Sequence, residues 1–188
     1  MLATRADDLP KLLAEVGRQT AQVDQIFRDH STEQLRWRPD QKGWSVMGHV
    51  AHMSIINVPY LDAIEERVGR ESGSTSAGPW SHPWFSRYFA TSMEPPVTRR
   101  FKTMKSMVPD LGSDPETELA TFKAAQTKMT SVIEACRGVD LGRVRFASPF
   151  FRLFRFSIGG GLGLLLAHNR RHIWLAEEVM AHASFPRD

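Results

Sequence analysis

The stretch from Ser157 to Val179, SIGGGLGLLLAHNRRHIWLAEEV, decides the fold of this chain. Its apolar residues recur every three or four positions, which is the spacing of one face of an α-helix. That face consists of Ile158, Leu162, Leu165, His168, His172, Leu175 and Val179. Ser157 predicts the helix start, because a serine side chain can accept a hydrogen bond from the first free backbone N–H groups. Three glycines, at 159–161, either weaken the first turn or allow another part of the chain to approach closely.

Three further segments have the same helical spacing, and they cover residues 9–27, 45–68 and 115–137. Pro59 predicts a kink or a local break within the second of them. Residues 70–113 are rich in glycine, serine and proline but retain aromatic residues, so we expect a folded crossover with short helices near 82–90 and 97–107. No segment has a convincing strand pattern. We therefore predict an all-α fold, one domain over residues 1–188, built as a four-helix bundle with a long crossover between helices 2 and 3.

Composition and charge narrow the classes of partner. The chain has 24 basic and 21 acidic residues, and a formal net charge of +3 does not indicate a nucleic-acid binder. The weakly polar run 156–167 is too short to span a bilayer. The single cysteine, Cys136, lies on the apolar face of the 115–137 helix, and we interpret it as an inert core residue. A single cysteine cannot form an internal disulfide, so we expect a cytoplasmic protein. From the charge and the short apolar run we expect neither a nucleic-acid nor a membrane partner.

Histidines provide the candidate chemistry. His168 and His172 are four residues apart, so both lie on one helix face, where they can hold one metal ion or form a hydrogen-bonded structural pair. The second helix adds His49 and His52, three residues apart. His52 can supply the third ligand that a catalytic metal site needs, and His49 can either be that ligand instead or orient the site. For the remaining histidines we expect surface roles; they are His30, His82 and His182.

Two sequence motifs contain these histidines and resemble those of a known family. The sequence LRWRP at 35–39, followed by GWSVMGHVAH at 43–52, and the sequence AHNRRH at 167–172 resemble the DinB superfamily of YfiT-like proteins. In that family a ligand histidine follows the tryptophan by eight residues, which here is His52. The resemblance thus implies a metal site of His52, His168 and His172. Many relatives have glutamate where this chain has Gly48.

The resemblance also implies a chemistry. Three histidines accept a divalent metal such as Zn, Ni, Fe or Mn, and the sequence does not choose among them. Family members are linked to S-transferases that use low-molecular-weight thiols. Asn169 follows His168 where a His-Glu-x-x-His hydrolase would have its general base, so we favour a metal-dependent thiol S-transferase over a metal-dependent hydrolase. A non-catalytic helical bundle that binds a small ligand, or a metal with a fourth protein ligand such as His49, is the third hypothesis.

The expected partners are a small-molecule substrate, in particular a low-molecular-weight thiol, and a second copy of the chain in a homodimer. Arg170 and Arg171 either receive an anionic cosubstrate or form a solvated helix flank, which is the interpretation we favour. Glu177 and Glu178 should turn away from the ligand face. Trp80 and Trp84 either cover the metal pocket or fill a groove between helices.

Overall fold

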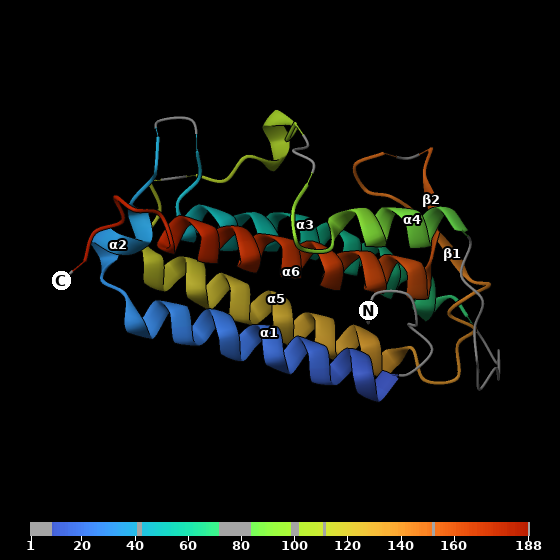
Figure 1. Cartoon of the computed structure of the whole chain (residues 1–188). Helices are drawn as coiled ribbons and strands as arrows, with labels where there is room; N and C mark the ends of the chain where they lie inside the picture. The colour runs from blue at the N-terminus through green and yellow to red at the C-terminus, as the bar shows by residue number, and fades with distance from the viewer. Residues whose placement is uncertain are drawn as a thin grey trace.

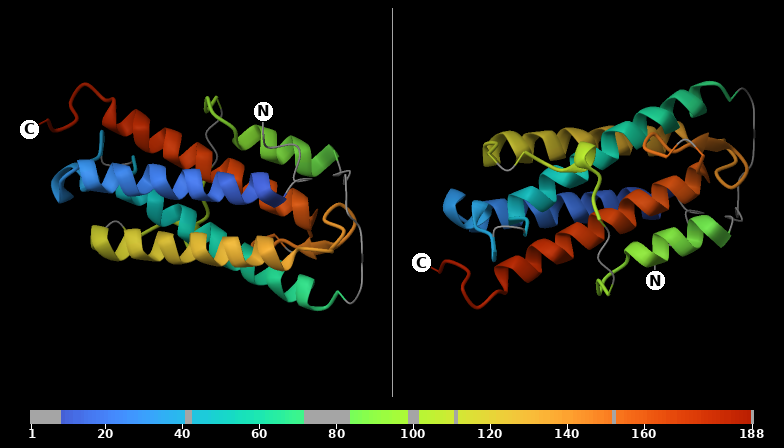
Figure 2. Two further views of the ribbon diagram at one scale, coloured as in Figure 1. Left: turned by 90° about the horizontal axis from the view of Figure 1, so that it is seen from below. Right: turned by 90° about the horizontal axis from the view of Figure 1, so that it is seen from above.

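The computed structural model describes residues 9–40, 43–71, 84–98, 102–110, 112–151 and 153–187. Four long helices run alongside one another (Figure 1). They are α1 (Leu9–Asp29), α3 (Val46–Gly69), α5 (Pro115–Ala135) and α6 (Ile158–Met180). Helices α1 and α3 each pack against both α5 and α6, so the order around the bundle is α1, α5, α3, α6 (Figure 2). The predicted all-α bundle with a long crossover is confirmed.

The predicted helix starts coincide with capping side chains. Ser45 accepts a hydrogen bond from the N–H of Gly48 at the start of α3, and Ser157 accepts one from Gly160 at the start of α6. Asp114 caps α5 in the same way. Each cap satisfies a backbone N–H that the helix itself leaves unpaired. Helix α3 continues through Pro59 without a break.

The crossover contains α4 (Trp84–Met93), which packs on α6, and the 3₁₀ turn η1 (Lys105–Met107), which touches α3. Helix α4 corresponds to the short helix expected near 82–90. The second expected helix, at 97–107, is wrong: in the described part of that range only η1 is helical. Met104 and Val108 on either side of η1 have extended backbones, and Pro109 favours that conformation at Val108.

Two small features were not foreseen. A short helix α2 (Thr32–Arg36) follows α1 and is capped reciprocally by Ser31 and Gln34. Strands β1 (Arg145–Ala147) and β2 (Arg155–Ser157) form an antiparallel pair in which Phe146 lies opposite Phe156. The expectation of no strand is therefore wrong. Three-residue strands are too short to produce a recognisable alternation in the sequence.

The largest apolar core lies between all four long helices and extends to the β-pair. Gly161 approaches the Phe146 ring so closely that a Cβ at this position would lie 2.5 Å from Cζ of Phe146. The close approach explains one of the three glycines that begin α6. Cys136 is buried in this core, as predicted. None of the described helices is long and apolar enough to span a bilayer.

Candidate metal centre

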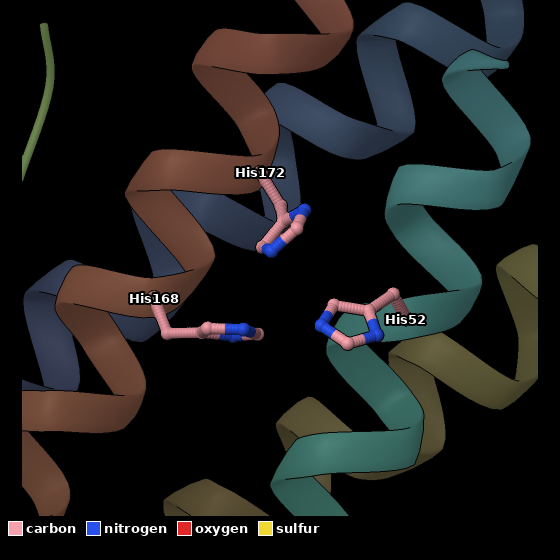
Figure 3. A group of neighbouring side chains, drawn as sticks. All are labelled: His52, His168 and His172. Atoms are coloured by element: carbon pink, nitrogen blue, oxygen red, sulfur yellow. The ribbon is translucent and has the colours of Figure 1, made fainter. Parts of the chain in front are cut away.

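Helices α3 and α6 bring the three predicted histidines together. His52 projects from α3, and His168 and His172 project from successive turns of α6 into the space between the two helices (Figure 3). Each imidazole offers one nitrogen to this space, and the three nitrogens lie within 4.8 Å of one another. His52 and His172 are buried, and His168 is partly buried. This arrangement could hold a single metal ion.

Hydrogen bonds determine which nitrogen of two imidazoles is free. Nδ1 of His52 lies 2.7 Å from the carbonyl oxygen of Met107 in η1. A carbonyl only accepts, so Nδ1 of His52 carries the proton and Nε2 keeps its lone pair. Nδ1 of His172 lies 3.0 Å from Nδ1 of His49, which leaves Nε2 of His172 for the cluster.

The third imidazole has an unsatisfied atom. Nδ1 of His168 is buried and has no hydrogen-bond partner among the described residues. A buried polar atom without a partner costs free energy, so the folded chain would gain from a group that pairs with it. An orphaned nitrogen in a cluster of three imidazoles fits a metal site, since a structural pair would satisfy its members.

Burial keeps the imidazoles neutral. Desolvation is the main cause that lowers the pKa of His49 to about 3, and it lowers the pKa of His168 and His172 well below the usual value. The pKa of His52 is also lowered by burial, against the opposing effect of its bond to Met107. Positive charge on Arg171 adds to the effect on His49, His168 and His172. Neutral imidazole is the form that binds metals.

One aromatic side chain covers the histidines. The Trp44 ring centroid lies 4.8 Å from that of His52 and 5.5 Å from that of His49. It lies 5.9 Å from the His172 ring and is nearly parallel to it. Trp44 therefore covers the cluster, which is one of the two roles considered for Trp80 and Trp84. Trp80 and the Trp84 side chain, like His82, lie outside the described residues.

Behind the histidines lies a buried layer of polar side chains. Asn169 accepts a hydrogen bond from Asn57 and donates to Gln19 and Gln126. It thus belongs to the core of the bundle, and its neutral amide could not act as a general base beside His168. Glu177 and Glu178 are exposed, as expected from their position on the helix.

The two arginines of α6 differ from the solvated flank that we favoured. Arg170 is partly buried and pairs with Glu15 of α1 and with Glu94 at the end of the crossover helix. Arg171 is buried. The interpretation of a solvated flank is wrong, because Arg171 is buried and Arg170 pairs with a carboxylate of α1 and with that of Glu94, directly after α4.

These features define the class of the protein: a four-helix bundle with a three-histidine cluster that could hold a divalent metal between two of its helices. A family model described as "DinB superfamily" matches residues 15–176. The chain belongs to the DinB superfamily.

Comparison with solved structures shows which known fold the chain shares. No curated protein sequence matches the chain. A similar solved structure is YfiT from Bacillus subtilis, described as a probable metal-dependent hydrolase with an unusual four-helix bundle topology. The two share 16% sequence identity with a TM-score of 0.62, and the match covers 95% of this chain and 89% of YfiT. At this identity the likeness establishes a shared fold.

Proposed function

We propose that this protein is a metal-dependent enzyme that transfers a low-molecular-weight thiol to a small electrophile. His52, His168 and His172 would hold the divalent metal through one nitrogen each. The observation that carries the proposal is a cluster of three neutral nitrogen donors whose atoms lie within 4.8 Å. His49 is not a member of this group, so the described residues leave room in the coordination sphere for an exogenous ligand.

The choice of reaction rests on the groups around the cluster. Among the described residues, no carboxylate forms a hydrogen bond with these imidazoles or is a cause of their pKa shifts. Hydrolysis at a metal site is commonly assisted by a carboxylate base, as in the His-Glu-x-x-His enzymes. Thiol transfer has less need of a base, because a bound divalent metal by itself lowers the pKa of a coordinated thiol.

The side chains of this protein would then perform three tasks. The carbonyl of Met107 orients His52, and burial keeps all three imidazoles neutral and ready to bind. Trp44 forms an apolar wall that limits access of water to the cluster. In the transfer itself, the thiol proton leaves to solvent, a sulfur–carbon bond forms, and the leaving group departs with the electron pair of the broken bond.

A metal-dependent hydrolase is the second candidate, and one observation favours it. The structural neighbour YfiT is described as a probable metal-dependent hydrolase. In this alternative a water molecule would take the place of the thiol, since a metal ion with an open position also lowers the pKa of water.

Metal content and activity test the proposal together. We expect one equivalent of divalent metal in protein purified without chelators, and loss of that metal in His52→Ala and His168→Ala variants. The variant His182→Ala, at an exposed position, is the matched control and keeps its metal. The loaded protein should conjugate a small thiol to a chromogenic aryl halide and should lack activity toward a nitrophenyl ester. Ester hydrolysis without conjugation would favour the hydrolase, and absence of metal uptake would overturn both.

The homodimer and the cytoplasmic location remain predictions from the sequence. Light scattering coupled to size-exclusion chromatography tests the first, and a mass of one chain would contradict it.

A further inference from the structure

His49 makes a contact that neither the family resemblance nor the proposed reaction explains. It lies in the first turns of α3, one turn before His52, and is buried. Its Nδ1 is 3.0 Å from Nδ1 of His172 on α6. Trp44 covers both rings. A hydrogen bond between two neutral imidazoles needs one donor and one acceptor, so its direction sets the tautomer of both rings.

The position of the His172 ring decides which of the two imidazoles donates the hydrogen bond. One ring nitrogen of His172 faces the space shared with His52 and His168, and the other points away from it (Figure 3). Since Nδ1 is the atom beside His49, the nitrogen in the cluster is Nε2. Nε2 can donate its lone pair to a metal only if the proton is on Nδ1. Nδ1–H of His172 must then donate to His49, which accepts through Nδ1 and carries its own proton on Nε2.

We infer that His49 is a positioning residue, which fixes His172 in the tautomer and ring orientation that present Nε2 to the metal. The inference rests on the proposed metal ligands but not on the reaction they support. A hydrogen-bond acceptor on the far nitrogen of a metal-bound histidine is typically worth 10- to 100-fold in metal affinity. The carbonyl of Met107 has the corresponding role for His52.

The first measurement is the tautomer of His172 in metal-free protein, read from two-bond proton–nitrogen correlation spectra of the imidazoles. We expect the proton on Nδ1 of His172 and on Nε2 of His49. The His49→Asn variant should preserve the His172 tautomer, since the oxygen of asparagine can accept from the place that Nδ1 occupies. The His49→Leu variant removes the acceptor, and the His172 signals should move toward the other tautomer. A proton on Nε2 of His172 in the wild type would overturn the inference.

The second measurement is the affinity for Zn²⁺, from competition with a chromophoric chelator. His49→Leu should raise the Kd by 10- to 100-fold, and His49→Asn should restore a value close to that of the wild type. His182→Leu is the matched control at an exposed position and should leave the Kd unchanged. Circular dichroism and urea denaturation of each metal-free variant separate a lost hydrogen bond from a damaged fold.

Each result leads to a decision. A wild-type Kd in His49→Leu, or an equal loss in the leucine and asparagine variants, overturns the positioning role. A wild type that binds no Zn²⁺ overturns it together with the metal site. Neither readout uses thiol transfer, so a failure of the proposed reaction is distinguishable from a failure of this inference.

Discussion

Lowering the pH should destabilise the metal-free protein, because several buried imidazoles stay neutral in the folded chain at pH values where they are protonated in the unfolded chain. A group whose pKa is lower in the folded state binds protons preferentially in the unfolded state, so the free energy of unfolding falls as pH drops below the unfolded pKa. The usual histidine pKa is 6.5, and burial lowers it to about 3 for His49 and well below 6.5 for His168 and His172. The loss therefore begins near pH 6.5 and grows toward acid.

The size of the effect follows from the number of such groups. Between about pH 7.5 and about pH 5.5, each imidazole with a strongly lowered pKa reduces the free energy of unfolding by about 1.4 kcal/mol. His49, His168 and His172 together give about 4 kcal/mol, and the lowered pKa of His52 acts in the same direction. A loss of this size is a large part of the 5–15 kcal/mol that is typical of a domain.

Urea denaturation at a series of pH values, in the presence of a chelator, measures this loss directly. The His168→Asn variant should lose about 1.4 kcal/mol less than the wild type over the same pH interval. His182→Asn, at an exposed position, is the control and should match the wild type. Excess Zn²⁺ should raise the free energy of unfolding at each pH and leave its pH dependence near neutrality in place, since the folded imidazoles are neutral with or without the metal. Equal stability at both pH values, or an unchanged loss in His168→Asn, would refute the reasoning.

Other predictions concern packing, capping and reactivity. Gly161→Ala should lower the free energy of unfolding by about 1–3 kcal/mol, because its Cβ would collide with the buried Phe146 ring. Gly17→Ala, on the exposed face of α1 with nothing within 4 Å of the new Cβ, should instead raise it by about 0.5–1 kcal/mol; urea denaturation compares the two, and effects of equal sign would contradict the packing argument. Ser45→Ala should cost about 1 kcal/mol through loss of the cap on α3, and an unchanged urea midpoint would count against it. Burial raises the pKa of the Cys136 thiol to about 12, so a thiol reagent should label it only as fast as the protein opens; rapid labelling of folded protein would show that it is accessible.

The bundle was predictable because its helices carry long periodic patterns with capping residues at their starts. Ser157 marked a helix start correctly, Ser45 and Asp114 cap the starts of two other predicted helices, and the apolar face of the last helix placed His168 and His172 toward the interior. The short elements were missed, since three to five residues produce no usable periodicity. Such pieces depend on tertiary contacts, as the pairing of Phe146 with Phe156 illustrates.

Within the candidate site, the sequence identified the imidazoles but not the groups that orient them. The carbonyl of Met107 could not be foreseen, because every residue has a carbonyl and its direction depends on the fold. The position of Trp44 over three histidines was missed as well, although its sequence distance from His52 formed part of the family motif. The sequence could not decide whether His49 or His52 lies beside His168 and His172, because residues three apart on a helix lie on the same face. The structure was needed to distinguish them.

The bond from His52 to Met107 makes the crossover part of the candidate site, although the crossover lies outside the bundle. In the proposed metal site, any event that pulls the backbone of η1 away from α3 would remove the hydrogen-bond acceptor of His52 and would weaken metal binding. By thermodynamic reciprocity, a metal bound there would hold η1 against α3 by the same free energy. A protein or small molecule that binds the crossover and moves η1 would therefore change the metal affinity without contacting a histidine. Conversely, a bound metal would reduce the mobility of η1, which lies at the outside of the bundle.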